Sequence, residues 1–327
     1  MINRRDALKF GLSALAVASV PSTLFAQGEY PERPVRLIVP YAPGGVVDVI
    51  GRLWANEMKS ALGTVVVENQ SGAGGLTGAA EASRSAPDGY TILLGNTSTQ
   101  VLNPAIAEKP PYDPATAFQT VSILANSAVA IAVNPGIAAK TLAELVAYIK
   151  ANPGKLSYGS PGAGTFTNLA GEMFKQAAGV PDLVHIPYRG AGPGMSDLVS
   201  GHIPAMVLNI TNQSLELHRT GKIRIVAVMT PKPLAVLLDV PTAGETYPGL
   251  VAMLFTGLFV PTGTPQPIVD RIAKANRSAM ASAEFQKKLA ATGFDSVADT
   301  PAEAQRFVDA ERARLVPLVK SVGFKPE

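Results

Sequence analysis

Five short polar loops hold the residue types in this chain that are best suited to bind an anion. They follow expected strands and span residues 41–45, 95–99, 160–165, 188–192 and 209–212. They offer neutral donors: backbone N–H groups, the hydroxyls of Thr97, Ser98, Ser160 and Thr165, and the amides of Asn96 and Asn209. Several such donors can converge on a carboxylate, and each contributes roughly 1.5–3 kcal/mol against a charged group. These residue types therefore favour the capture of a small carboxylate.

The first loop, Tyr41-Ala42-Pro43-Gly44-Gly45, joins an expected strand at 36–40 to a helix that begins near Val46. Such a junction places free backbone N–H groups and the positive end of a helix dipole at the carboxyl edge of a parallel sheet. The loop holds no Lys and no Ser, so we interpret it as an anion cradle rather than a reaction centre. The alternative is an ordinary strand-to-helix turn closed by two glycines.

Several loop residues also have a purely structural explanation. Ser160 or Thr165 could cap the helix that begins at Phe166. Asn96 and Asn209 could equally be turn residues. These alternatives stay open at the level of the sequence.

Three residues near these loops are expected to be structural. Arg189 could pair with an acidic ligand, but a surface position beside a turn is the simpler interpretation. Asp48 would repel an anion, so we expect it to orient the start of the helix. Trp54 lies on the apolar face of that helix and is expected in the core.

The usual signatures of an enzyme are missing. The three histidines, His185, His202 and His218, are dispersed and show no metal-binding spacing. Ser160 lies in no G-x-S-x-G motif, because Tyr158 occupies the first glycine position. Glycine motifs for phosphates or dinucleotides are absent, and so are paired carboxylates near the expected cleft. The sequence therefore predicts no catalytic residue, no metal and no cofactor.

From residue 28 onward, expected strands and helices alternate. Strands are expected at 35–39, 65–68, 90–94, 121–133, 156–159, 184–187, 205–208, 224–229 and 254–260. Helices are expected at 46–62, 76–85, 142–152, 166–178, 195–200, 213–219, 267–281, 283–292 and 301–321. This order predicts an α/β fold of two lobes, each built on a parallel sheet with right-handed crossovers.

Two long apolar runs are expected to join the lobes, at 121–133 and 254–260. Lobe 1 then comprises residues 28–126 and 252–327, and lobe 2 comprises 127–251. Polar loops from both lobes would face each other across one ligand cleft.

The first 27 residues are typical of an export signal. Arg4 and Arg5 precede an apolar run at 10–20, and the small residue Ala26 stands before the expected cut. The apolar run is too short to anchor the chain in a bilayer. The arginine pair resembles a twin-arginine signal.

Composition narrows the class of protein further. The 327 residues give room for about two domains. Lys and Arg number 28 against 25 Asp and Glu, and without residues 1–27 the balance is 25 to 24, with no basic run. Nucleic acid is therefore not an expected partner. The chain has no Cys, which excludes disulfides and thiolate nucleophiles.

Motifs in a fixed order cover essentially the whole chain after residue 28. The first are Tyr30-Pro31-Glu32-Arg33-Pro34-Val35-Arg36, the 41–45 turn with Asp48 and Arg52, Val67-Glu68-Asn69, Gly72-Ala73-Gly74-Gly75, Pro87-Asp88-Gly89-Tyr90-Thr91 and Tyr112-Asp113-Pro114. Then come Asn152-Pro153-Gly154-Lys155-Leu156, Ser160-Pro161-Gly162-Ala163-Gly164-Thr165, His185-Ile186-Pro187-Tyr188-Arg189-Gly190, Pro241-Thr242 with Glu245, and Pro261-Thr262-Gly263-Thr264-Pro265. In these motifs the chain resembles the Bug family, the extracytoplasmic solute receptors of tripartite tricarboxylate transporters.

The resemblance implies a type II periplasmic binding protein fold that closes on small organic acids. A carboxylate is then expected against the first-lobe turn and the opposing loops, often through bridging water. By position in the family's motifs, the ligand-binding residues are Tyr41, Pro43, Gly44, Gly45, Val46, Asn96, Thr97, Ser98, Ser160, Gly162, Gly164, Thr165, Asn168, Tyr188 and Asn209.

This chain departs from the family's pattern at several positions. Val46 and Val47 stand where Ser or Thr is frequent, and Asn168 stands where His is common. Asn209 replaces a common Asp, and Phe255 replaces a frequent Trp. Without the Asp, the site lacks a partner for a ligand ammonium, which argues against amino acids. The added valines are compatible with an aromatic or longer-bodied carboxylate.

The expected function is that of a periplasmic solute-binding receptor. As a monomer, it would capture a dicarboxylate, tricarboxylate or aromatic carboxylate by closure of the lobes and deliver it to the permease subunits of the transporter. One alternative is an exported α/β enzyme that acts on a carboxylic acid, which turnover of the bound acid would reveal. Another is a sensor protein without a transport role, whose action would not depend on a permease.

Overall fold

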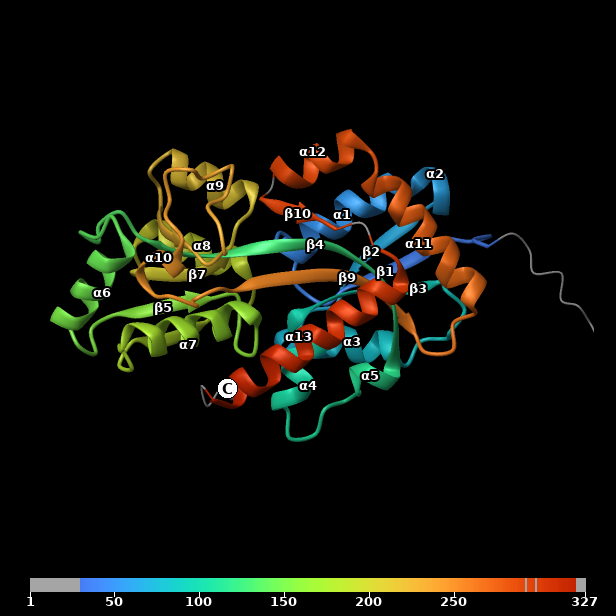
Figure 1. Cartoon of the computed structure of the whole chain (residues 1–327), viewed down its shortest axis with the longest axis horizontal. Helices are drawn as coiled ribbons and strands as arrows, with labels where there is room; N and C mark the ends of the chain where they lie inside the picture. The colour runs from blue at the N-terminus through green and yellow to red at the C-terminus, as the bar shows by residue number, and fades with distance from the viewer. Residues whose placement is uncertain (1–29, 292, 298, 322–327) are drawn as a thin grey trace, which may run out of the picture.

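A computed structural model describes residues 30–291, 293–297 and 299–321 of the chain (Figure 1). The expected export signal, residues 1–27, lies outside this range. The strands are β1 (Val35–Val39), β2 (Val65–Asn69), β3 (Thr91–Asn96), β4 (Phe118–Val133), β5 (Ser157–Ser160), β6 (Val184–Pro187), β7 (Ala205–Asn209), β8 (Arg224–Val228), β9 (Met253–Pro261) and β10 (Phe294–Ser296). The helical segments are α1 (Val46–Glu57), α2 (Lys59–Leu62), η1 (Ala73–Gly75), α3 (Leu76–Ser83), η2 (Ser98–Leu102), α4 (Asn103–Ile106), α5 (Pro114–Ala117), α6 (Leu142–Ala151), α7 (Phe166–Ala178), α8 (Ala191–Ser200), α9 (Asn212–Arg219), α10 (Ala243–Thr246), α11 (Gln266–Met280), α12 (Ala283–Ala291) and α13 (Pro301–Ser321).

The described strands form one mixed sheet whose main order is β2-β1-β3-β9-β4-β7-β5-β6, with β8 and β10 paired to β4. In its first half β1 pairs in parallel with β2 and β3, and in its second half β5 pairs in parallel with β6 and β7. The long strands β4 and β9 run antiparallel to each other and to their neighbours β7 and β3. They pass from one half of the molecule to the other (Figure 1). The expected α/β class and the two crossing strands are confirmed.

Apolar residues at helical spacing seat α1 against the first half of the sheet. Ile50, Trp54 and Met58 recur every four residues, and each is at most 1% exposed. The Trp54 indole Nε1 donates a hydrogen bond to Oδ1 of Asn276 in α11 at 2.9 Å, so its burial leaves no unsatisfied donor. The expectation that Trp54 lies in the core is confirmed.

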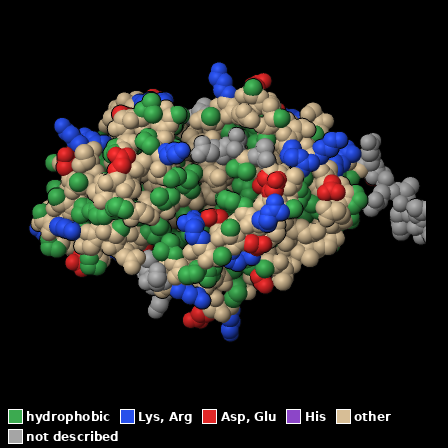
Figure 2. Space-filling view, viewed as in Figure 1, with side chains coloured by type: hydrophobic (Ala, Val, Ile, Leu, Met, Phe, Trp, Pro, Cys, Tyr) green, Lys and Arg blue, Asp and Glu red, His purple; other side chains and the backbone are tan. Residues whose placement is uncertain are grey.

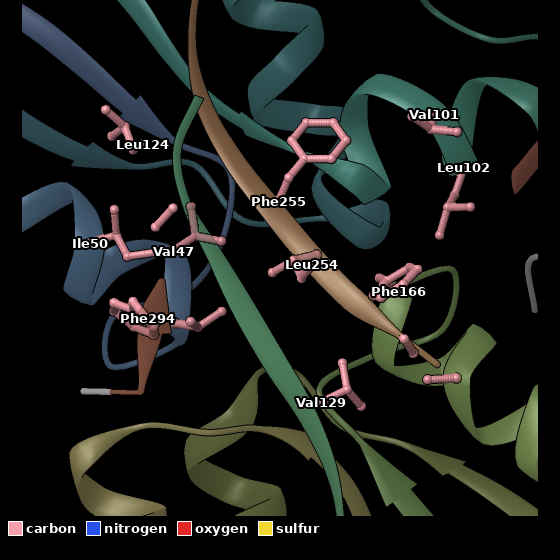
Figure 3. Close-up of a cluster of buried hydrophobic side chains, with 14 of the residues drawn as sticks. Val47, Ile50, Val101, Leu102, Leu124, Val129, Phe166, Leu254, Phe255 and Phe294 are labelled. Carbon is pink, nitrogen blue, oxygen red and sulfur yellow. The ribbon is translucent and has the colours of Figure 1, made fainter. Parts of the chain in front are cut away.

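One buried apolar cluster surrounds the crossing strands and reaches both halves of the sheet (Figure 3). Leu254 and Phe255 of β9 belong to it together with Val47 of α1, Leu102 of η2 and Phe166 of α7. Val47 and Phe166 lie in the first turns of α1 and α7. Packing against the crossing strands therefore fixes where these two helices start.

Several element boundaries differ from expectation, and two of the differences lie at the expected polar loops. Gly95 and Asn96 belong to β3 rather than to a loop, because they pair with Gly257 and Thr256 of β9. Helix α8 begins at Ala191, four residues before the expected start at Met195. Pro193 falls in its first turn, where a missing N–H costs no hydrogen bond.

The lobe boundaries expected at 126/127 and 251/252 stay a prediction. The first falls inside β4, which belongs to both halves of the sheet, and the second falls just before β9. On the face shown in Figure 2, Lys and Arg side chains are scattered among Asp and Glu side chains. Within the described ranges, no helix is both long enough and apolar enough to cross a membrane.

Candidate functional site

A cavity of about 610 Å³ lies between loops from the two halves of the sheet. Most of the residues expected to bind a ligand line it. These are Tyr41, Gly44, Gly45, Val46, Asn96, Ser98, Gly162, Gly164, Thr165, Tyr188 and Asn209. Four other expected residues are not part of the lining: Pro43, Thr97, Ser160 and Asn168. Most of the residues assigned from the sequence thus line one cavity, and the other four lie outside its lining.

The N-terminus of α1 reaches the cavity without a side-chain cap. Its N-cap residue is Gly45, and the backbone N–H groups of Gly45, Val46 and Val47 make no hydrogen bond within the described part of the chain. The amide of Gly44 instead donates to Oδ2 of Asp48 at 2.9 Å. Free donors and the positive end of the helix dipole therefore face the cavity, as expected for an anion cradle.

Asp48 is 2% exposed and supports the loop that forms the anion cradle. Its carboxylate accepts hydrogen bonds from Arg52, from the amide of Gly44 and from Nδ2 of Asn69. Burial alone would raise the pKa of Asp48, but these hydrogen bonds outweigh it and hold the pKa below its usual value. The carboxylate stays ionised and is fully occupied by protein donors, which supports the structural interpretation of Asp48.

Tyr41 and Asn96 form a polar pair in the wall of the cavity. The Tyr41 hydroxyl donates to Oδ1 of Asn96 at 3.0 Å, and the amide of Thr99 donates to the same oxygen at 3.1 Å. Oδ1 is thus occupied, and Nδ2 of Asn96 makes no hydrogen bond among the described residues. Burial raises the pKa of Tyr41 to about 12, so its hydroxyl keeps its proton at neutral pH. Asn96 therefore presents a neutral donor, rather than an acceptor, to the cavity.

The hydroxyls of Thr97 and Ser98, the two residues after Asn96, make different contacts. Thr97 is fully buried, and its Oγ1 accepts a hydrogen bond from the amide of Phe255 in β9 at 3.0 Å. Ser98 lines the cavity, and its Oγ accepts from the amide of Phe166, the first residue of α7, at 2.9 Å. Thr97 therefore stabilises the position of the crossing strand β9, whereas Ser98 links the two walls of the cavity.

The 160–165 loop uses most of its polar groups internally. Thr165 caps α7: its Oγ1 accepts from the amide of Asn168 at 3.3 Å and donates to the carbonyl of Gly162 at 2.7 Å. Oδ1 of Asn168 accepts from the amide of Gly164 at 3.2 Å. The capping alternative considered for this loop thus describes Thr165, and Asn168 shapes the loop from behind.

Ser160 and His185 form a hydrogen-bonded pair that resembles part of a nucleophilic site. Oγ of Ser160 lies 2.8 Å from Nε2 of His185, and it also bonds to the backbone of Gly162. A nucleophile must reach a reacting atom in its substrate. Ser160 is completely buried and does not line the cavity. The pair therefore supports the loop rather than facing a ligand.

A second uncapped helix N-terminus meets the cavity from the other half of the sheet. Helix α8 has Gly190 as its N-cap residue, with φ of 115°, and no side chain caps it. A Cβ on Gly190 would lie 3.4 Å from Cβ of Ala42 in the first loop. Arg189 precedes this glycine, lines the cavity and is exposed. The Tyr188 hydroxyl is turned to Asp197, to which it donates at 2.7 Å.

Asn209 ends β7 and lines the cavity. Its Nδ2 atom is buried and has no hydrogen-bond partner within the described residues. Leaving such a donor unpaired costs about 1–3 kcal/mol, which a ligand acceptor would recover. The neighbouring helix α9 offers no free end, because Thr211 and Ser214 form a capping box at its start.

The sequence-based interpretation missed part of the wall. Segment 71–76, Asn103 and Ile106 line the cavity, and Nδ2 of Asn103 donates to the carbonyl of Gly74 at 2.6 Å. The glycine run at 72–75 could have indicated this part of the wall, because glycine readily adopts positive φ. Gly74 and Gly75 both do so. Within the described part of the chain, no group of three or more acidic or His side chains is placed to hold a metal ion.

Comparisons with known proteins agree with this architecture. A family model described as the tripartite tricarboxylate transporter family receptor matches residues 50–324. The solved structure of the periplasmic binding protein BugD is 33% identical with a TM-score of 0.86, and 91% of this chain and 100% of that chain are covered. Rpa4515 of R. palustris, solved with adipate, is 31% identical with a TM-score of 0.87 and the same coverage. MatC from Rhodopseudomonas palustris, solved with bound malate, is 29% identical with a TM-score of 0.82, and 89% of this chain and 100% of that chain are covered.

A mixed sheet in two halves, with a cavity between their loops, is the fold of a periplasmic binding protein. The chain belongs to the receptor family of tripartite tricarboxylate transporters, and its resemblance to the Bug proteins is confirmed. Members of this family are solute-binding receptors.

Proposed function

We propose that this protein is a periplasmic receptor that binds a small organic carboxylate in the cavity between its two halves and delivers it to the permease of a tripartite transporter. The observation that carries the proposal is the pair of uncapped helix N-termini. Helices α1 and α8 come from opposite halves, and both start with glycine at the border of one cavity. Backbone N–H groups at helix N-termini suit a carboxylate.

The ligand class is supported by two relatives in the same family, which were solved with adipate and with malate. The ligand-contacting set proposed here consists of the expected residues that line the cavity. Thr97, Ser160 and Asn168 act behind it, since their polar groups bond to other parts of the protein. Closure of two lobes, with the divisions at 126/127 and 251/252, would bring the donors of α1 and α8 onto one ligand.

The receptor role is proposed without catalysis and without a cofactor, and the protein is proposed to act as a monomer in the periplasm. The export signal expected at residues 1–27 supports this location. The enzyme alternative has one feature in its favour, the hydrogen bond between Ser160 and His185, but Ser160 does not reach the cavity.

A screen for stabilising ligands tests the proposal. The protein without residues 1–27 is mixed with monocarboxylic, dicarboxylic, tricarboxylic and aromatic acids, and its Tm is measured at neutral pH. A ligand that binds only the folded state raises the Tm, and at a given concentration a tighter ligand raises it more, so at least one class of acid should do so. The expected result also includes recovery of each hit chemically unchanged after prolonged incubation. Uncharged amides that stabilise the protein better than the acids would contradict a carboxylate site.

A further inference from the structure

The charges that face the cavity are few and lie in one place. Of the described residues that line it, Arg189 alone is ionised, and no Asp or Glu takes part. Arg189 makes no ion pair with another described residue, and it stands directly before Gly190, the N-cap of α8. Gly190 approaches Ala42 of the first loop, and Gly45, the N-cap of α1, lies next to the carbonyl of Ala42. We call Ala42, Gly45, Arg189 and Gly190 the anion pole.

Much of the remaining wall is apolar. Six large hydrophobic side chains from both halves line the cavity: Leu76, Ile106, Phe166, Met195, Leu208 and Leu254. A second ionised carboxylate against this surface would lose its hydration without meeting a cation. That loss of hydration is strongly unfavourable for an ion that is left unpaired.

The neutral polar groups of the wall are mostly occupied. Thr165 and Thr211 cap helices, and Nδ2 of Asn103 is bound to Gly74. The amide nitrogens of Asn96 and Asn209, the side-chain amide of Gln213 and the hydroxyl of Ser71 also line the cavity, and they meet no described protein partner. These neutral groups can satisfy a carboxylate oxygen near the anion pole or a hydroxyl or carbonyl oxygen, but they do not neutralise a second charge.

We infer that the cavity selects a monocarboxylate with an apolar body, whose one carboxylate lies at the anion pole. The inference rests on the proposed function and specifies its ligand. The apolar body contacts the large hydrophobic side chains of the wall, and the apolar surface that is thereby withdrawn from water favours binding. Dicarboxylates of the same skeleton bind more weakly because their second carboxylate has no cation to pair with.

Matched ligands that differ only in charge test this inference. Hexanoate, adipate and hexanamide share a six-carbon chain, and benzoate, terephthalate and benzamide share a benzene ring. Dissociation constants are measured by calorimetry at pH 7.5. In the better of the two skeletons, we expect the monocarboxylate to bind at least about tenfold more tightly than the dicarboxylate. A dicarboxylate that binds as tightly would overturn the inference and leave the proposed function standing, whereas an amide that binds as tightly as its acid would overturn both.

A second cation in the apolar wall should remove most of the preference for the monocarboxylate. Ile106 is half-buried and ends α4, so Ile106→Lys places its charge at a helix C-terminus, where the dipole favours it. Ile106 lines the cavity but is not one of the four residues of the anion pole. We expect the preference for hexanoate over adipate to shift toward adipate by about tenfold.

The matched control for this variant is Ala105→Lys, because Ala105 is half-buried in the same helix but does not line the cavity. It should leave the preference unchanged. Arg189→Gln gives the complementary measurement and should weaken hexanoate binding several-fold without changing the binding of hexanamide. If Ile106→Lys folds cooperatively and still prefers hexanoate to the same degree as the parent protein, the inference that a second carboxylate lacks a cation in this wall is wrong.

Discussion

Four of the helices that begin at the border of the same cavity, α1, α7, α8 and α9, begin in two different ways. Helices α7 and α9 have Thr165 and Thr211 at the N-cap, and the hydroxyls of these residues accept a hydrogen bond from a backbone amide in the first turn. Helices α1 and α8 have glycine there, Gly45 and Gly190, and no side chain caps them. Replacing a capping side chain by glycine costs only a few tenths of a kcal/mol, since water or a ligand can reach the free amides. The capped ends hold the walls in shape, whereas the uncapped ends remain available for an anion.

The same contrast separates the two kinds of polar residue around the cavity. Thr97, Ser160 and Asn168 bond to other parts of the protein and do not line it. Asn96 and Asn209 line it and keep one amide nitrogen unpaired within the described residues. A polar residue that is already paired gives a ligand little, because a new hydrogen bond would only replace an old one. Residues of the binding surface therefore differ from those of the wall in having an unpaired donor, and not in residue type.

The strongest test of the contrast is to cap α1. Gly45 has φ of −76°, and a Cβ there would meet nothing nearer than the Ala42 carbonyl at 3.7 Å, so Gly45→Asp fits without strain. Its carboxylate would accept from the free amides and repel a bound acid. We expect ligand affinity to fall by more than about 100-fold, while the Tm of the unliganded protein is unchanged or higher.

Two further variants separate the charge from the cap. Gly244→Asp adds an acid to the first turn of α10, which does not line the cavity, and should leave binding intact. Gly45→Asn adds a cap without a charge and should have an intermediate effect. Normal binding by Gly45→Asp would show that the α1 N-terminus does not hold the ligand.

The next largest effect is expected on stability, at Asp48. Asp48→Asn keeps the shape but weakens hydrogen bonds from Arg52 and Gly44, so the free energy of unfolding at pH 7 should fall by about 1–3 kcal/mol. The pKa of Asp48 is lower in the folded protein than in the unfolded chain, so the contribution of its carboxylate to stability is present above the unfolded pKa and is lost as the pH falls through the folded pKa. Urea unfolding at pH 7 and near pH 2.5 measures this change. A difference between variant and parent that is the same at both pH values would contradict the assignment.

A smaller loss of stability should follow when a capped helix is uncapped. Thr165→Ala removes the acceptor for the amide of Asn168 and should cost about 1 kcal/mol of unfolding free energy. Thr165→Ser keeps the hydroxyl and serves as the control. Denaturant unfolding measures the loss, and calorimetry should show a change in ligand affinity far below that of Gly45→Asp. A loss of affinity as large as that of Gly45→Asp would mean that the hydroxyl of Thr165 contributes as much to binding as the α1 N-terminus.

The contrast between capped and uncapped helices could be predicted from the sequence where it depends on local chemistry. The start of α1 at Val46 and the start of α7 at Phe166 match expectation, because two glycines and a Thr before an apolar helix are local signals. The start of α8 was missed by four residues, because Gly192 and Pro193 are loop residues in most settings. In α8 they fall in the first turn, where neither residue disturbs a hydrogen bond.

Other features depend on contacts between distant segments, which no local signal gives. The antiparallel pairing of β9 with β3 and β4 is a matter of sheet topology, and β10 is a three-residue strand. Whether Ser160 faces a ligand or His185 is decided by the neighbouring strand β6, 25 residues away. Asn103 joins the wall only because η1 packs beside it. Sequence reasoning found the loops, but the direction of each polar side chain came from tertiary packing.

Ser160→Ala has the smallest expected effect on binding and tests this last distinction. If Ser160 belongs to the wall, removing its hydroxyl should change the dissociation constant of the ligand by less than about twofold. Its loss should instead lower stability slightly, because His185 and the amide of Gly162 lose a partner. Calorimetry on the variant and the parent protein measures the first effect, and urea unfolding measures the second. A tenfold loss of affinity without a loss of stability would show that Ser160 belongs to the binding surface. Only a direct contact between its hydroxyl and the ligand would lower affinity and leave stability unchanged.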